Sequence, residues 1–423
     1  MTKAKLSTST DDFSKSQVPE THTYSGLHIA LVVVGGTIGI PAFLMAANIG
    51  AALGLVLAVK AFILGCIVLG ILGSLTALAG SKSRYSAYML TKFAFGRTGA
   101  HIANLAIALS LIGWFGVISN MFGQAMYETI LAITGWDGPK LLFILIGSVL
   151  MVWVSVRGFK GLDKLALILV PVMALFLIYA ASISFGRIED WNTGVGGMTF
   201  AAAVSSVIGS YIAGVCIQPD YSRYAKNSSH AVWSALLALG VSFPFVLTMA
   251  AIPSIAMGEP DLIKVMIVIG IGVPAFLLLL LASLSSNVLC LYSAGLSLAT
   301  IFTRQTMKTI IIATGIIGTA IAFSHATDYL IKYLILLGIT IPPIASIYVV
   351  DSLILRREHN EASLQEEPAI DIAAFIAWGL AILVGYLASK NIFSITSFAA
   401  IDSIVVSGLV FLGLKFFTTR LTK

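Results

Sequence analysis

Residues 32–43 are VVVGGTIGIPAF, and this stretch decides which fold the sequence predicts. Gly35, Gly36, Gly39 and Pro41 fall in the middle of an apolar run. Proline removes a backbone hydrogen-bond donor and glycine loosens a helix, so the run predicts a membrane helix that unwinds near its centre. Unwound backbone at membrane depth lines a cavity or lies buried in protein, because its carbonyls cannot face lipid.

A second interruption is predicted in residues 206–214, SVIGSYIAG, where Gly209 and Ser210 lie near the centre of another apolar run. The motif GGTIG (35–39) aligns with GSYIA (209–213), five predicted helices later in the chain. Paired breaks in corresponding positions of two halves are typical of inverted-repeat transporters with a site near the midplane. The alternative is that each glycine cluster only lets helices pack closely.

The composition is that of a polytopic membrane protein. The chain has 423 residues, 58% of them hydrophobic and 10% charged, with a mean hydropathy of +0.99. Runs of about 20 apolar residues are long enough to cross a bilayer. We predict twelve spans, at residues 27–50, 51–79, 100–133, 140–156, 165–186, 198–217, 231–256, 273–303, 307–325, 328–354, 368–389 and 393–414.

The orientation of these spans follows from the distribution of positive charge. Most of the 25 Lys and Arg residues fall on one side if the N-terminus lies inside, and inner loops are the ones enriched in these residues. We therefore expect an inner-membrane protein with cytoplasmic tails at residues 1–26 and 415–423. The first tail is polar, has no signal peptide, and is expected to be disordered.

With five helices in each repeat, the first repeat covers residues 27–186 and the second covers 198–354. Residues 368–414 then form two helices outside this ten-helix core. The net charge of +6 is explained by cations in the inner loops, so no nucleic acid and no obligate protein partner is expected, only the lipid bilayer. The three cysteines lie in apolar runs and show neither a disulfide framework nor metal-ligand spacing.

A polar cluster interrupts the eighth predicted span, residues 281–295, LASLSSNVLCLYSAG. Ala282, Ser285 and Ser286 stand at i, i+3 and i+4, so they share one helix face. Hydroxyl and carbonyl oxygens suit a small, hard cation such as sodium, particularly beside the free carbonyls of an unwound first span. The alternative is that the hydroxyls bond back to the preceding turn or to a neighbouring helix.

Asn287 belongs to the same cluster and has two open interpretations. A carboxamide in hydrocarbon needs up to four hydrogen-bond partners, and an uncompensated one costs several kcal/mol. Facing a cavity, the amide would suit a planar ligand that both donates and accepts. Facing another helix, it would make structural bonds.

Two aromatic residues are predicted near the same depth. Trp114, in IGWFGV (112–117), lies well inside the third span, away from the interfaces where tryptophan is enriched. Tyr211 lies in the interrupted part of the sixth span. Together they could stack on a flat heterocycle; filling of the core is the alternative for each.

The positions of the acidic residues bear on whether the coupling ion is sodium or a proton. No carboxylate lies in the centre of the first, sixth or eighth predicted span, and a proton relay usually needs one. Sodium coupling is therefore favoured over proton coupling. Paired acids or a His/Asp cluster at membrane depth are missing too, so we expect a transporter and not an enzyme, without a cofactor.

Several stretches are similar to the nucleobase:cation symporter-1 family, and most to its bacterial cytosine permeases. They occur in the family's order and cover most of the chain: SRYSAYMLTKFAFGRTG (83–99), IGWFGV (112–117), IGSYIAG…DYSRYAKN (208–227), LYSAGL (291–296) and IPPIASIYVVDSLILRR (341–357). The resemblance implies an all-α LeuT-type fold with a five-plus-five inverted-repeat core, interrupted helices 1 and 6 and two peripheral helices. It also implies sodium-coupled uptake of a nucleobase by alternating access.

The resemblance further implies roles for individual residues. Trp114 and Tyr211 would stack on opposite faces of the substrate, while Gly209, Ser210 and Asn287 would contact its edge. Sodium would be held by two groups of ligands, the carbonyls of Gly39, Ala42 and Ala282 and the hydroxyls of Ser285 and Ser286.

The sequence departs from the cytosine-permease pattern at the predicted pocket. Leu111 stands where those proteins have a glutamine, and Val288 and Leu289 stand where they have polar residues. Fewer contacts to a polar edge are expected, so a less polar pyrimidine, a purine or a thiamine-precursor pyrimidine is a candidate beside cytosine. A symporter of another small solute, such as an amino acid, is the alternative on the same fold, and proton coupling is the alternative mechanism.

Overall fold

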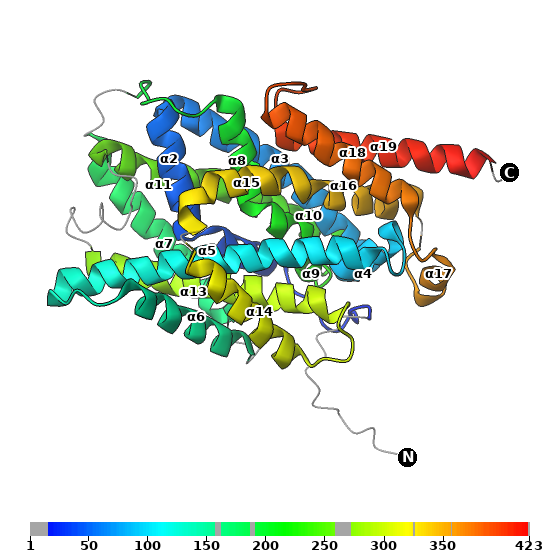
Figure 1. Ribbon diagram of the computed structural model, residues 1–423, viewed down its shortest axis with the longest axis horizontal. Coiled ribbons are helices and arrows are strands. Elements are labelled where there is room, and N and C mark those ends of the chain that lie inside the picture. Colours follow the sequence, from blue (N-terminus) through cyan, green and yellow to red (C-terminus); the bar gives the residue numbers. More distant parts are fainter. Residues whose placement is uncertain are drawn as a thin grey trace, which may run out of the picture.

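The computed structural model describes residues 16–156, 162–186, 191–258, 272–324, 326–356 and 358–421, and these residues are predominantly helical (Figure 1). Outside the helices, one isolated bridge joins Tyr24 and Ala225. The helices are α1 (Gly26–Thr37), α2 (Ile40–Leu53), α3 (Leu55–Ser83), α4 (Ala87–Phe95), α5 (Ala100–Thr134), α6 (Lys140–Val156), α7 (Leu162–Phe185), α8 (Phe200–Cys216), α9 (Gln218–Ser222), α10 (Ser228–Ala235), α11 (Phe243–Met257), α13 (Gly272–Ala299), α14 (Met307–Ala322), α15 (Leu330–Thr340), α16 (Pro342–Val350), α17 (Glu361–Glu366), α18 (Ile372–Ser389) and α19 (Ala399–Leu421). Short π-helical segments at Leu236–Ser242 and Asp351–Leu355 and a 3-10 turn at Ala326–Tyr329 complete the helical part of the described chain.

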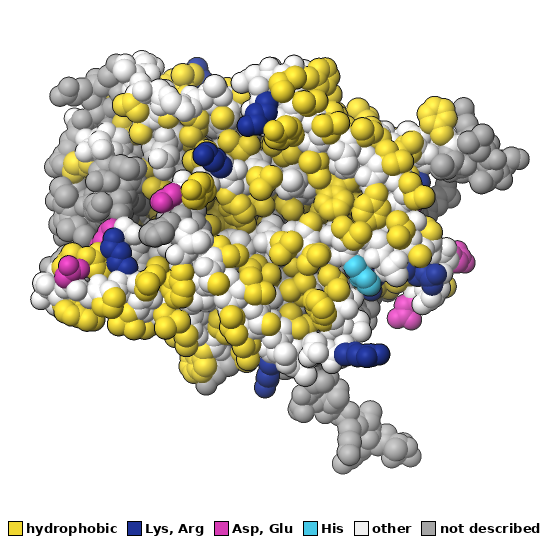
Figure 2. Space-filling model, viewed as in Figure 1, with side chains coloured by type: hydrophobic (Ala, Val, Ile, Leu, Met, Phe, Trp, Pro, Cys, Tyr) yellow, Lys and Arg dark blue, Asp and Glu magenta, His cyan; other side chains and the backbone are white. Residues whose placement is uncertain are grey.

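Among the described residues, seven helices are long and apolar enough to cross a membrane, and α1 with α2 makes an eighth span if the bent pair is counted as one. Apolar helices of 10–17 residues are found in addition, α6, α8, α14 and the second part of α7. Hydrophobic side chains accordingly cover much of the visible surface (Figure 2). Every predicted span coincides with a helical segment, whereas the count of twelve stays a prediction.

The first predicted break is present. Helices α1 and α2 meet at an angle of 64°, with Ile38 and Gly39 extended between them. Pro41 lies in the first turn of α2, where a missing N–H is harmless and the fixed φ favours helix initiation. The break therefore lies where the glycines and the proline predicted it.

The second break lies later than predicted. Helix α8 continues through Gly209 and Ser210 and ends at Cys216, and the chain is interrupted at Ile217 before the short helix α9, which has Pro219 in its first turn. Gly209 serves close packing instead. A Cβ there would lie 1.8 Å from the carbonyl oxygen of Leu334 in α15, so the glycine permits contact of two helix backbones.

The predicted disorder of the N-terminal tail is wrong for residues 16–25. The side chain of Val18 is buried, and its N–H donates to the carbonyl of Arg84 (3.1 Å). The backbone of Tyr24 exchanges hydrogen bonds with Tyr224 and Lys226. The segment is fixed because it supplies hydrogen-bond partners to two loops at once, at Arg84 and at residues 224–226. Residues 1–15 lie outside the described chain.

Gly209→Ala is expected to destabilise the protein. A methyl group would overlap the Leu334 carbonyl, and overpacking costs about 1–3 kcal/mol or more, so the melting temperature in detergent should fall. Gly379→Ala in α18 is the matched control, because a Cβ there meets no atom within 4 Å. Equal melting temperatures for the two variants would contradict the packing role of Gly209.

Candidate functional site

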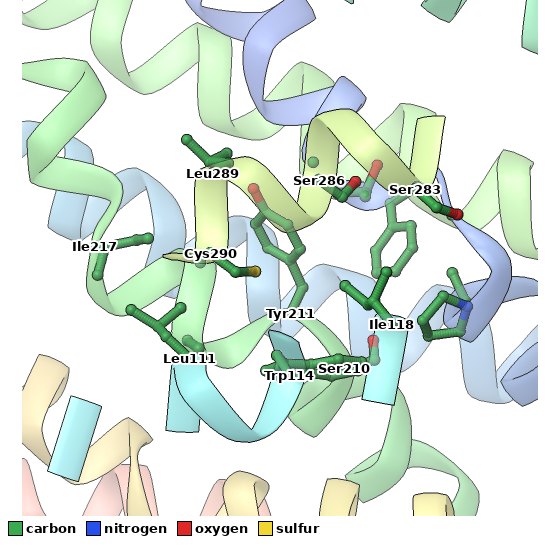
Figure 3. Close-up of a pocket in the computed structure, with 18 of the residues that line it drawn as sticks. Leu111, Trp114, Ile118, Ser210, Tyr211, Ile217, Ser283, Ser286, Leu289 and Cys290 are labelled. Atoms are coloured by element: carbon green, nitrogen blue, oxygen red, sulfur yellow. The ribbon is translucent and has the colours of Figure 1, made fainter. Parts of the chain in front are cut away.

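A cavity opens beside the break between α1 and α2. Its walls come from α1, α2, α5, α8, α9, α11 and α13, and Figure 3 shows side chains from several of these helices pointing into it. The lining residues are Gly36, Thr37, Gly39, Pro41, Ala42, Leu111, Trp114, Ile118, Ser210, Tyr211, Ala213, Gly214, Ile217, Tyr221, Phe243, Ser283, Ser286, Leu289 and Cys290.

The structure brings together only part of the predicted site. The predicted residues that line the cavity are Trp114, Tyr211, Ser210, Gly39, Ala42 and Ser286. The others, Gly209, Asn287, Ala282 and Ser285, do not line it. Gly209 packs on α15 as described above, so its expected place at the edge of the substrate is corrected.

Trp114 on α5 is held at the cavity wall by an aromatic neighbour. Its ring meets Tyr333 edge-on, with centroids 5.9 Å apart. The Tyr333 hydroxyl in turn donates to the carbonyl of Ser110, one turn earlier on α5 (2.7 Å). This arrangement fixes one edge of the indole and leaves the ring at the cavity.

Tyr211 on α8 is fitted between glycines. A Cβ at Gly36 would lie 3.1 Å from its hydroxyl oxygen, and one at Gly214 would lie 2.5 Å from its ring. The hydroxyl donates to the carbonyl of Val33 on α1 (3.4 Å). The small residues that predicted an unwound helix therefore also make room for this ring.

Ser286 on α13 reaches the broken helix. Its hydroxyl donates to the carbonyl of Gly35 (3.2 Å), with the carbonyl of Ile38 at 3.5 Å. These oxygens belong to the end of α1, where the next turn of helix no longer supplies partners. The same oxygens and the hydroxyl form the kind of donor set that a hard cation takes.

Two further predicted sodium ligands, Ala282 and Ser285, lie on the same helix as Ser286. Ala282 is buried one turn before Ser286, and Ser285 is half-buried beside it. Among the described residues, no group of His, Cys, Asp or Glu could hold a metal ion. The set of hydroxyl and carbonyl oxygens thus fits an alkali cation better than a transition metal.

The cavity-facing position expected for Asn287 is wrong. Its side chain is fully buried, and its Nδ2 donates to the carbonyl of Phe115 (3.2 Å) and the hydroxyl of Ser119 (3.0 Å), both on α5. It points away from the cavity because the cavity face of α13 carries Ser283, Ser286 and Cys290. The Asn287 amide therefore makes structural hydrogen bonds between α13 and α5, which was the alternative interpretation.

Other residues at the cavity were given no role in the sequence analysis. Ser283 precedes Ser286 by three positions and Ile118 follows Trp114 by four, so helical spacing from the predicted residues would have placed both on the cavity face. Cys290, one turn beyond Ser286, is half-buried there, while Cys66 and Cys216 are fully buried elsewhere.

A carboxyl group lies just beyond the cavity. Asp220 is in α9, next to the lining residue Tyr221, and its Oδ1 accepts from the N–H of Ala87 (2.9 Å). Its Oδ2 has no partner. Burial raises the pKa of Asp220 to about 6, against the lowering effect of Arg223.

A family model described as "Permease for cytosine/purines, uracil, thiamine, allantoin" matches residues 17–410. The chain belongs to this permease family. The assignment confirms the predicted family, and it makes the protein a membrane permease and not an enzyme.

Two relatives are similar in sequence to this permease over more than half of its length. It is 27% identical to the cytosine permease of Escherichia coli O157:H7, over 89% of each chain. It is 24% identical to the hydantoin permease of Microbacterium maritypicum, over 69% of this chain and 65% of that one.

Solved structures show the fold of the permease. The nucleobase-cation-symport-1 family transporter Mhp1, closed with bromovinylhydantoin bound, matches with a TM-score of 0.83 at 18% identity, over 96% of each chain. A Na+-coupled sialic acid symporter matches with a TM-score of 0.66 at 13% identity, over 92% of this chain and 89% of that one. The predicted LeuT-type fold is thereby confirmed.

Asn287→Ala is expected to lower stability and to leave ligand binding unchanged. Removing a buried, hydrogen-bonded amide costs about 1–3 kcal/mol, which a thermal melt would detect. Asn48→Ala in α2 is the control, because that half-buried amide bonds only within its own helix, to Leu44. Weakened ligand binding with an unchanged melting temperature would show that Asn287 contacts substrate after all.

Proposed function

We propose that this permease is a sodium-coupled symporter that imports a nucleobase or a related heterocycle by alternating access. The observation that carries the proposal is the cavity at the break between α1 and α2, with Trp114 and Tyr211 on its walls and Ser286 at the break. We place it in the inner membrane with both termini in the cytoplasm, as the Lys and Arg distribution favours. The repeat boundaries given above belong to the same proposal.

The substrate class is supported by the cavity walls. Two aromatic rings give a flat, neutral ring large contact area at low entropic cost. The relatives named above are permeases for cytosine and for hydantoin, both small planar heterocycles. An amino acid would need donors for its carboxylate and a partner for its ammonium group, and no charged side chain is found among the lining residues.

Sodium as the coupling ion is supported by the donor set at the break. The proposed ligands are the carbonyls of Gly39, Ala42 and Ala282 and the hydroxyls of Ser285 and Ser286. Ser286 joins α13 to the end of α1, so a cation bound there would neutralise converging oxygens and hold the two helices together. Because Gly39 and Ala42 also line the cavity, ion and substrate binding would stabilise the same conformation.

Proton coupling is the second candidate, and Asp220 is the observation that favours it. The carboxyl is buried next to Tyr221 with one oxygen unpaired, and its raised pKa of about 6 means that it holds a proton up to that pH while buried. Exposure to water would release the proton. Uptake driven by a pH gradient without sodium, and lost in Asp220→Asn, would favour this mechanism.

Counterflow in proteoliposomes tests the transport claim. Vesicles loaded with unlabelled uracil, cytosine or hydantoin should accumulate the labelled compound from outside in sodium, because a carrier exchanges substrate while a channel does not. Trp114→Ala should insert normally and weaken binding by about tenfold to a hundredfold through lost stacking. The absence of counterflow for every ring in the wild type would overturn the proposal.

The double variant Ser285→Ala, Ser286→Ala is expected to raise the sodium concentration needed for half-maximal uptake by about tenfold or more, since two oxygen ligands are lost. The control is Ser297→Ala on the same helix, which loses a buried bond to the carbonyl of Asn104 away from the cavity. Unchanged sodium dependence in the double variant would discard the proposed ion site.

A further inference from the structure

The polarity of the cavity is one-sided. In Figure 3 the serine residues Ser210, Ser283 and Ser286 lie at one end of the cavity, and Leu111 and Ile217 lie at the other. Leu289 lies toward the apolar end as well. A ligand that fills the cavity would therefore meet hydroxyl groups at one edge and hydrocarbon at the opposite edge.

The order of residues along the helices agrees with this division. On α8, Ser210 precedes Ile217 by two turns, and on α13, Ser283 precedes Leu289. The charge distribution predicts that both helices run from outside to inside, whereas α5, which carries Leu111, runs the other way. The hydroxyl end then faces outward and the leucine end faces the cytoplasm.

Of the three serines at this cavity, Ser283 is the one whose hydroxyl is left for a ligand. Its side chain is fully buried and its Oγ has no hydrogen-bond partner. The hydroxyls of Ser210 and Ser286, by contrast, donate to the carbonyls of Val207 (2.7 Å) and Gly35 (3.2 Å). A buried hydroxyl without a partner is costly, so a ligand that bonds to Ser283 recovers what folding leaves unsatisfied.

The opposite end of the cavity is lined mainly by apolar side chains. Leu111, Ile217 and Leu289 have no polar side-chain atoms, and the thiol of Cys290 is only a weak donor. Tyr221 also lines the cavity, and its hydroxyl, like that of Ser283, has no hydrogen-bond partner. Against Leu111 and Leu289, an alkyl group would gain about 0.8 kcal/mol per methylene.

We propose that the permease prefers a neutral heterocycle whose polar edge bonds to Ser283 and whose opposite edge carries an apolar substituent that packs on Leu111 and Leu289. This inference rests on the proposed function and deepens it, because it names which member of the heterocycle class the site selects. Ser283 determines affinity for the ring, and the leucines determine the preference for substitution.

Matched ligand pairs test the inference on the purified permease in sodium: uracil with thymine, cytosine with 5-methylcytosine, and hydantoin with 5-methylhydantoin. Members of each pair share their hydrogen-bonding groups and differ by one methyl. In the pair that binds, the methylated member should bind about fourfold more tightly, as one buried methyl group predicts. Leu289→Gln, or Leu111→Gln as a second variant, should remove or reverse this preference.

Ser283→Ala should weaken both members of the pair alike, by about threefold to tenfold, with no loss of melting temperature, because the hydroxyl has no partner in the protein. Ser254→Ala is the matched control: its hydroxyl is also buried and unpaired, but it does not line the cavity, so affinity should not change. Tighter binding of the unmethylated member, or unchanged affinity in Ser283→Ala, would overturn this inference alone. Binding of no ring at all would overturn the proposed function together with it.

Discussion

Backbone groups inside a bilayer must find partners within the protein, and the break between α1 and α2 puts this constraint at the centre of the structure. The end of α1 leaves carbonyls at Gly35 and Ile38 that a continuing helix would have satisfied. Ser286, from a helix far along the chain, donates to them. The cavity lies beside this break, and Ser286 is also one of the proposed cation ligands.

The aromatic residues are positioned by what surrounds this break. The ring of Tyr211 has room at the cavity wall because Gly36 and Gly214 have no side chains. Its hydroxyl donates a hydrogen bond to the carbonyl of Val33. Trp114 is held by Tyr333 on α15. The two aromatic rings and the proposed ion ligands therefore lie close together beside the break between α1 and α2. This proximity would allow the binding of ion and substrate to be coupled.

The parts of the fold that were predictable depend on local chemistry. Glycine and proline act on their own stretch of backbone, so the break at Ile38–Gly39 and the helical spans could be predicted from the sequence. Gly209 and Asn287 could not be placed, because their partners, Leu334 and Phe115, are more than a hundred residues away in the chain. Composition shows that a small or polar residue needs a close neighbour, but not which face of its helix that neighbour lies on.

The affinity of the purified permease for nucleobases and hydantoins, measured in sodium and again in potassium, tests most directly whether an ion at the broken helix supports ring binding. If the two sites stabilise one conformation, one ring should bind at least about tenfold more tightly in sodium, a coupling of about 1.4 kcal/mol. Equal affinity in the two salts would contradict the proposed coupling while leaving the cavity as a binding site. The absence of binding by every ring in both salts would contradict the substrate class as well.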